Sequence, residues 1–186
     1  MAPNQPPWPR EWLMTDERIG ERLWEAIEAL PEGGGIVFRH YATPAEQRIE
    51  LARRVAGVCR ERDLTLAIAG DVSLAERLGA RLVHKPDAPS ALPCSMPVHD
   101  EAEADRARTV GATLVFVAPV QATRSHPGGQ ALGPDRAAEL ARMSGRLAIA
   151  LGGVDAGRFA KLDAAFPGSF HGYAGIDCWL RGPSRE

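Results

Sequence analysis

The sequence predicts a (β/α)₈ TIM barrel, a compact α/β domain with a truncated fourth helix. Eight short apolar runs alternate with amphipathic stretches along the chain, which is typical of parallel βα units. The runs are apolar throughout, as strands are when both faces of a sheet are covered. The chain has 186 residues, fewer than the roughly 200–250 typical of this fold. A doubly wound open sheet is the competing architecture.

Each expected strand is followed by a helix or by a visible gap. The apolar runs lie at residues 12–15, 35–40, 64–70, 81–85, 94–98, 113–120, 147–154 and 170–176. Helices are expected at 18–30, 43–62, 73–79, 100–111, 134–144 and 155–166. Residues 86–93 are too few and too rich in proline for a helix, and a last helix would have to lie within 177–186. The missing length therefore falls after the fourth and eighth strands.

Capping residues mark the start of several of these helices. Ser, Thr or Asp followed three positions later by Glu satisfies the first free N–H groups of a helix. This pattern predicts helix starts at Thr43 (with Pro44 and Glu46), Ser73 (with Glu76) and Asp100 (with Glu103), and Asp155 is a further cap.

Composition restricts the class of protein. The formal net charge is −2 and the charges of both signs are interleaved, which argues against nucleic acid as a partner. Three cysteines without metal-type spacing are expected to be reduced, small hydrophobic residues. No apolar run reaches the roughly 18 residues of a membrane helix. We expect a cytoplasmic protein that binds no membrane, with a flexible arm at 1–10, one barrel domain at 11–180 and a tail at 181–186; a homodimer is left open.

The active site of a barrel lies at the carboxyl ends of its strands. This rule selects a set of polar and glycine residues without further information. They are Asp16, Arg39, His40, Tyr41, Asp71, His84, Lys85, Asp87, Thr123, Ser125, His126, Gly152, Gly153 and Gly175.

Adjacent glycines end the seventh strand, directly before a helix. Gly152 and Gly153 let backbone N–H groups approach an anion, and the helix dipole adds a favourable potential. The loops after strands seven and eight form the phosphate site of many barrels. We therefore expect a phosphate here, with a tight turn as the alternative.

The other candidates have structural alternatives. Arg39 at the end of an apolar strand faces either an anion or a carboxylate partner. Asp71 and Asp87 are metal ligands or ordinary turn residues. His84 and His171, inside apolar runs, are more typical of hydrogen-bonded core histidines than of ligands. The loop around Arg124 and His126 either holds an anion or is solvated.

The order of several segments resembles the thiamin phosphate synthase/TenI superfamily from Trp12 to Trp179. The segments that carry the resemblance are "WLMTD", "VFRHY", "LGARLVHKPD", "PVHDEAEADRARTVGATLVFVAPVQAT" and "LAIALGGVDAGRF". The resemblance implies a (β/α)₈ barrel. Its synthases join a hydroxymethylpyrimidine diphosphate to a thiazole phosphate and release diphosphate with Mg²⁺, and its TenI branch includes thiazole tautomerases.

The resemblance also assigns roles by position. Arg39 matches the arginine that holds the pyrimidine diphosphate, and Thr123 and Ser125 match the hydroxyls of a mobile loop over the site. Gly152 and Gly153, with Gly175 and Ile176, match the backbone cradle of the thiazole phosphate.

This sequence departs from the family pattern around the diphosphate. Arg-Glu-Lys is replaced by Arg39-His40-Tyr41, and Asn-Asp-Arg by Ala69-Gly70-Asp71. The first metal aspartate is therefore lost or displaced to Asp71, and the second falls near Pro89 with Asp87 nearby. The serine expected before His99 is Pro97, the lysine of the mobile loop is His126, and Pro119 lies where the tautomerase histidine is expected.

Three functions follow from these features. In a synthase-like transferase, Asp71 and Asp87 would bind Mg²⁺ and Lys85 or Tyr41 would replace the missing lysine. In a TenI-like isomerase, His40, His84 or His126 would move protons. In a barrel without catalysis, the same cradle would bind a phosphorylated ligand. The metal site discriminates the first function from the others.

Overall fold

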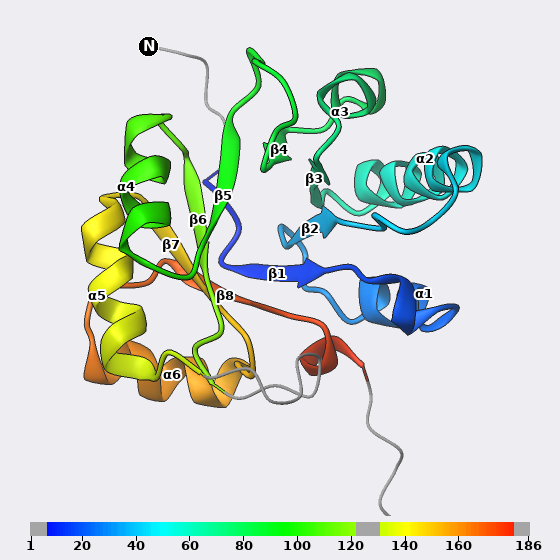
Figure 1. Ribbon diagram of the computed structural model, residues 1–186. Coiled ribbons are helices and arrows are strands. Elements are labelled where there is room, and N and C mark those ends of the chain that lie inside the picture. Colours follow the sequence, from blue (N-terminus) through cyan, green and yellow to red (C-terminus); the bar gives the residue numbers. More distant parts are fainter. Residues whose placement is uncertain (1–6, 122–130, 181–186) are drawn as a thin grey trace, which may run out of the picture.

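The computed structural model describes residues 7–121 and 131–180, and it is a closed barrel of eight parallel strands (Figure 1). The strands are β1 (Glu11–Met14), β2 (Gly35–Phe38), β3 (Thr65–Ala69), β4 (Leu82–His84), β5 (Cys94–Val98), β6 (Leu114–Val117), β7 (Leu147–Leu151) and β8 (Gly172–Gly175). The helices are α1 (Arg22–Glu28), α2 (Ala45–Glu61), α3 (Val72–Leu78), α4 (Glu101–Thr109), α5 (Pro134–Ser144) and α6 (Ala156–Ala165).

Pairing of the first and last strands closes the barrel. β1 pairs with β8 in a register that runs from Glu11↔Tyr173 to Leu13↔Gly175. This pairing confirms the barrel and excludes the open sheet. Figure 1 shows α1, α2 and α3 on one side of the barrel and α4, α5 and α6 on the other.

The missing helices fall where the sequence predicts them. The chain runs from β4 to β5 without a helix between them. After β8 there is only a 3₁₀ turn, η2 (Asp177–Trp179), within the described residues. The truncated fourth helix is confirmed, and the short last element explains the rest of the length deficit.

Three expected helix starts are wrong in detail. The first helix is divided at Gly20, whose φ is 52°, into the 3₁₀ turn η1 (Glu17–Ile19) and α1. Pro44, not Thr43, is the N-cap of α2. Asp71, not Ser73, is the N-cap of α3 because its side chain accepts from the N–H of Leu74. The starts at Asp100 and Asp155 are confirmed, since each carboxylate accepts from an N–H three residues on.

Side chains from alternate strand positions fill the barrel interior. Trp12 and Met14 of β1, Val37 of β2 and Phe116 of β6 belong to one buried cluster. The Trp12 and Phe116 rings meet edge to face at 5.7 Å. A Cβ on Gly35 would overlap the Trp12 indole, so the glycine makes room for the ring.

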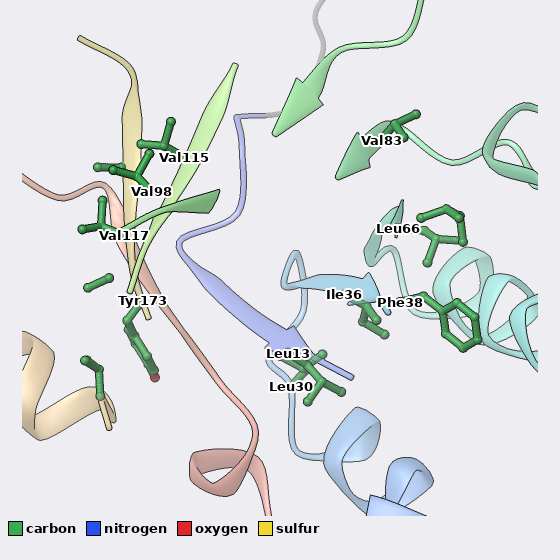
Figure 2. Packing of buried hydrophobic residues seen from close by; sticks show 14 of the residues in the cluster. Leu13, Leu30, Ile36, Phe38, Leu66, Val83, Val98, Val115, Val117 and Tyr173 are labelled. Carbon is green, nitrogen blue, oxygen red and sulfur yellow. The ribbon is translucent and has the colours of Figure 1, made fainter. Parts of the chain in front are cut away.

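A larger second cluster lies between the strands and the helices. It includes Leu13, Ile36 and Phe38, which alternate along their strands with the interior residues. Figure 2 shows Phe38 and Leu66 on the side of their strands that faces α2. The strands are therefore covered on both sides, as their continuous apolar runs predict.

The described part of the predicted N-terminal arm, residues 7–10, packs under the barrel. The carbonyl of Trp8 accepts from Nε2 of His171 at 2.9 Å, and the carbonyl of Arg10 accepts from the N–H of Tyr173 at 2.7 Å. The guanidinium of Arg81 lies 4.0 Å from the centre of the Trp8 ring. These four residues therefore close the barrel at its amino-terminal end, and residues 1–6 lie outside the described part.

The three cysteines are free, as expected. None of the helices in the described ranges combines the length and apolarity needed to span a membrane.

Two glycines make a matched test of this packing. A Cβ on Gly172 would overlap the Arg10 carbonyl, so Gly172→Ala should lower the free energy of unfolding by about 3 kcal/mol or more. Gly57 lies inside α2, where the nearest atom to an added Cβ is 4.0 Å away. Gly57→Ala should raise it by about 0.5–1 kcal/mol. Urea denaturation measures both, and equal effects of the two variants would contradict this packing.

Candidate functional site

Strand alternation places Arg39 and His84 at the carboxyl end of the barrel interior. Val37 and Leu82 are interior residues, and each of the two polar residues follows one of them by two positions. The ring of His84 lies edge to face against interior Phe116, with centroids 5.4 Å apart. The floor of the expected active-site face thus carries a guanidinium and an imidazole.

The two residues that follow β1 hold the side chain of Arg39. Its Nε donates to the carbonyl of Thr15 at 2.9 Å, and its Nη2 lies 3.8 Å from Oδ2 of Asp16. The side chain is 25% exposed. Burial lowers the pKa of Arg39, and the nearby Asp16 carboxylate opposes that change. Both alternatives for Arg39 are therefore present in part: it has a carboxylate neighbour, and part of the guanidinium still faces solvent.

Asp16 is bound more closely to Arg18 than to Arg39. Nε and Nη2 of Arg18 each donate to a different oxygen of Asp16 at 2.7 Å. The hydrogen bonds from Arg18 are the main cause that lowers the pKa of Asp16 to about 2. Since Arg18 neutralises Asp16, this carboxylate only weakly offsets the charge of Arg39.

The hydroxyl of Thr15 connects the backbone of β2 with His40. Oγ1 of the fully buried Thr15 accepts from the N–H of Arg39 and lies 3.0 Å from Nδ1 of His40. The His40 ring stacks on Phe38 with centroids 4.6 Å apart. Burial lowers the pKa of His40. His40 is therefore a packed, hydrogen-bonded residue just after β2.

His84 is the most strongly perturbed histidine among the described residues. Its Nδ1 lies 3.0 Å from Oγ of the buried Ser95. Burial, with the charges of Arg39 and Lys85, lowers the pKa of His84 to about 3. The imidazole is neutral at physiological pH, and its Nδ1 is occupied by the hydroxyl.

Arg48 and Tyr41 both lie at the carboxyl end of β3. Nη2 of Arg48 donates to the carbonyl of Ala69 at 2.8 Å, and its Nη1 donates to Oδ2 of Asp71 at 3.2 Å. A Cβ on Gly70 would lie 3.5 Å from the Tyr41 ring, so the exposed tyrosine lies over this loop. The charges of Arg39 and Arg48 both oppose the rise in the pKa of Tyr41 that burial causes. We call Arg39, Tyr41, Arg48 and Asp71 the β2–β3 edge.

Asp71 and Asp87 meet at the start of α3. Oδ1 of Asp71 accepts from the N–H of Leu74, and Oδ1 of Asp87 accepts from the N–H of Val72. With Arg48 on the second oxygen of Asp71, three of the four carboxylate oxygens accept from protein donors. The two aspartates therefore converge, but they converge on backbone N–H groups.

This arrangement does not fit a magnesium site. Mg²⁺ needs near-octahedral oxygen ligands at about 2.0–2.1 Å, and here a guanidinium already lies against Asp71. Within the described residues, no group of three or more His, Cys, Asp or Glu side chains is arranged to hold a metal. A metal-binding role for Asp71 and Asp87 stays a prediction.

The glycine turn after β7 has the backbone shape that the sequence indicates. Gly152 and Gly153 have φ of 95° and 66°, and the carbonyl of Gly153 accepts from Nη1 of Arg158 at 2.9 Å. Glycine adopts such positive φ angles more readily than any other residue, which explains why two glycines stand here in succession. The turn leads directly into α6, whose amino end faces the same side of the barrel.

Gly175 has a packing reason of its own. A Cβ there would lie 2.6 Å from Sγ of Cys178, so the glycine lets η2 fold back on β8. The next residue, Ile176, lines a cavity of about 340 Å³ together with Asp16, Arg18, Ile19, Arg22, Asp177 and Leu180. This cavity joins the ends of β1 and β8 on the expected active-site face.

A second cavity, of about 650 Å³, lies at the opposite end of the barrel. Trp8, Arg10, Glu32, Cys59 and Arg81 are among its lining residues. It is the larger of the two, but we place the candidate site at the carboxyl ends. Arg39, the buried histidines and the glycine turn are all at that end, where barrels carry their active sites.

Lys85 ends β4 with a φ of 49°, and its N–H donates to the carbonyl of Ser95. Its side chain is exposed, and its charge contributes to lowering the pKa of His84.

Three predicted site residues, Thr123, Ser125 and His126, lie outside the described residues. Their predicted contacts with phosphate stay predictions.

Comparisons with known proteins identify the family. Residues 12–166 match the model of a family described as thiamine monophosphate synthase. The chain belongs to this family. A thiamine biosynthesis bifunctional protein ThiM/ThiE from Symbiobacterium thermophilum is 30% identical over 159 residues, which are 76% of this chain and 32% of that protein. The chain therefore spans about a third of the length of that relative.

Solved structures support the same fold. A thiamine phosphate pyrophosphorylase from Pyrococcus furiosus has a TM-score of 0.73 at 21% identity, over 90% of this chain and 85% of that chain. An HpcH/HpaI aldolase from Desulfitobacterium hafniense has a TM-score of 0.57 at 9% identity, over 90% and 86% of the two chains. At these identities the likeness shows the barrel and nothing more.

Three residues of the site in this thiamine monophosphate synthase family member were not predicted from the sequence: Arg48, Thr15 and Ser95. Arg48 lies in the first turn of α2, where a cation opposes the helix dipole. This unfavourable position near the amino end of a helix could have indicated that Arg48 binds an acceptor outside α2. Nothing in the sequence pairs the two hydroxyls with His40 and His84, because those contacts depend on strand register.

The low pKa of His84 predicts a pH dependence of stability. The folded pKa of about 3 lies below the ordinary 6.5, so the unfolded chain binds the extra proton between these values. The free energy of unfolding should therefore be highest above pH 6.5 and fall as the pH drops, by about 2 kcal/mol between pH 6.5 and pH 5. His84→Asn, which keeps a polar group near Ser95, should flatten this slope in urea titrations at several pH values. An unchanged slope would contradict the neutral histidine.

The cap at Asp71 predicts a difference between two substitutions. Asp71→Ala removes the acceptor for Leu74 and the partner of Arg48, and should lower the free energy of unfolding by about 1–2 kcal/mol. Asp71→Asn retains the capping oxygen but loses the acceptor for Arg48, and should cost less than Asp71→Ala because the cap is kept. Urea denaturation of both variants at neutral pH measures the difference. Equal stability of the two would show that Asp71 does not cap α3.

Proposed function

We propose that this protein is a thiamin phosphate synthase-like transferase that couples a hydroxymethylpyrimidine diphosphate with a thiazole phosphate. The observation that carries the proposal is the placement of Arg39. A partly exposed guanidinium lies on the barrel floor, on the same face as the glycine turn before α6. A cation and a backbone cradle on one face suit two phosphorylated substrates.

The β2–β3 edge would bind the diphosphate. In the reaction, the bond between the pyrimidine methylene carbon and the diphosphate oxygen breaks, and the diphosphate keeps the electron pair. The thiazole nitrogen then donates its lone pair to the methylene carbon to form the new C–N bond. Arg39 would stabilise the charge that develops on the departing diphosphate, with Tyr41 and Lys85 as further donors on this face.

The turn at Gly152 and Gly153 would bind the phosphate of the thiazole. Its position at the amino end of α6 favours an anion. Arg158 holds the turn through the carbonyl of Gly153. Ile176, on the wall of the adjacent cavity, would pack against the apolar part of the same substrate.

A specific observation favours a second function. His84 is neutral, interior and within the influence of Arg39, so a TenI-like isomerisation of a thiazole phosphate, with His84 moving the proton, is the alternative. The engagement of Asp71 and Asp87 with α3 favours a third, a barrel that binds a phosphorylated ligand without catalysis.

A coupling assay discriminates these functions. The purified protein is incubated with both phosphorylated precursors, with and without Mg²⁺, and thiamin phosphate is followed by mass spectrometry. We expect product from the wild type and a loss of about 100-fold or more in Arg39→Ala, because one charge-stabilising donor is removed. Arg53→Ala, an exposed residue of α2 paired with Glu50, is the control and should retain the rate.

Absence of thiamin phosphate would favour one of the other two functions. No product, together with a higher melting temperature in the presence of the thiazole phosphate, would reject the synthase and favour the isomerase or the binding protein. Conversion of one thiazole phosphate isomer into another, lost in His84→Asn, would select the isomerase.

A further inference from the structure

The positive charge at the β2–β3 edge comes from the side chains of Arg39 and Arg48. Three of the four carboxylate oxygens of Asp71 and the neighbouring Asp87 already accept from protein donors. We propose that this protein binds the phosphate groups of its ligand at this edge without a divalent cation, with Arg39 as the contacting cation and Arg48 as the residue that neutralises Asp71. The inference rests on the phosphorylated ligand of the proposed function and concerns how that ligand is held.

Arg48 occupies the position from which Asp71 could otherwise reach a metal. Its guanidinium bridges the carbonyl of Ala69 and Oδ2 of Asp71, and its side chain is only 13% exposed. The group also lies 5.8 Å from the centre of the Phe38 ring. Because three contacts from two strands and one loop fix it, the cation is part of the folded structure rather than a mobile surface charge.

The second aspartate is occupied in a different way. Asp87 reaches across from the loop after β4 to the N–H of Val72. Moving it toward a metal would leave that N–H without its acceptor at the start of α3. A dication that binds Oδ2 of Asp71 would therefore have to displace the guanidinium of Arg48, and Oδ1 of Asp87 could bind it only by giving up the N–H of Val72.

Arg39 remains available to an anion. Within the described residues its partners are the carbonyl of Thr15 and, at 3.8 Å, Asp16, which is itself bound twice by Arg18. Planar guanidinium groups bind phosphate oxygens through two parallel hydrogen bonds. Tyr41 lies over Gly70, between Ala69 and Asp71, the two residues that bind Arg48.

The test is the metal dependence of pyrophosphate binding. Affinity of the full chain for inorganic pyrophosphate is measured by calorimetry in excess EDTA and again with Mg²⁺, with correction for the complex that Mg²⁺ forms with free pyrophosphate. We expect binding in EDTA, and an affinity that changes by less than about threefold when Mg²⁺ is added. Arg39→Met should lose binding by about tenfold or more. Arg53→Met, at an exposed residue of α2 that pairs with Glu50, is the control that retains binding.

Arg48→Met separates a neutralising role from a purely structural one. Without its guanidinium, Asp71 presents an unpaired carboxylate to the anion, so binding in EDTA should weaken and Mg²⁺ should restore it. Unchanged, metal-independent affinity in this variant would overturn the role of Arg48. A melting temperature close to that of the wild type is the check that the variant folds.

Three results would overturn the proposal. They are pyrophosphate binding by the wild type only with Mg²⁺, an affinity that Mg²⁺ tightens by about tenfold or more, and no binding in either condition. The coupling assay tests the proposed function independently of the pyrophosphate-binding experiment. Metal-independent binding without product would reject the synthase and leave this inference intact, whereas product with metal-dependent binding would do the reverse.

Discussion

The N–H groups at the start of each helix need acceptors, and this need decides the chemistry of the barrel face. In a (β/α)₈ barrel every helix begins near the end that carries the active site, so helix caps and catalytic groups compete for the same positions. Here Asp16, Asp71, Asp100 and Asp155 all follow strands, and each accepts from the N–H groups of the next turn. The aspartates on this face therefore serve as helix caps.

The capping aspartates also determine which arginines of this face have a close ionic partner. Arg18 binds Asp16 and Arg48 binds Asp71, so these two capping carboxylates each have a cationic partner. Among residues 7–121 and 131–180, the partners of Arg39 are a distant carboxylate and a carbonyl. The face therefore has a local excess of positive charge at the centre of the barrel, where a negatively charged ligand gains most from it.

Much of the fold was predictable from the sequence because alternation and capping are local properties. All eight strands and the helix at 134–144 follow from apolar runs and their flanking residues. The start of the helix at 73 was misplaced because Ser73 and Glu76 imitate a capping box, while the actual cap, Asp71, had been considered as a metal ligand or a turn residue. The family was also recognisable, since its segments keep their order along the chain. The partners of Arg39, His40 and His84 depend on which residues of neighbouring strands lie opposite one another, and no local pattern contains that register.

The segment under the barrel ties the two ends of the chain together. Nε of Arg10 donates to the carbonyl of His171, a residue 161 positions away, and Trp179 donates to the carbonyl of Trp12. Contacts of such separation form only after a large loss of chain entropy, and they slow folding. During synthesis, β1 must wait for β8 to emerge before it gains its second neighbour. Until then the strand edges of the half-formed barrel are unpaired, and unpaired edges of partly folded chains favour aggregation.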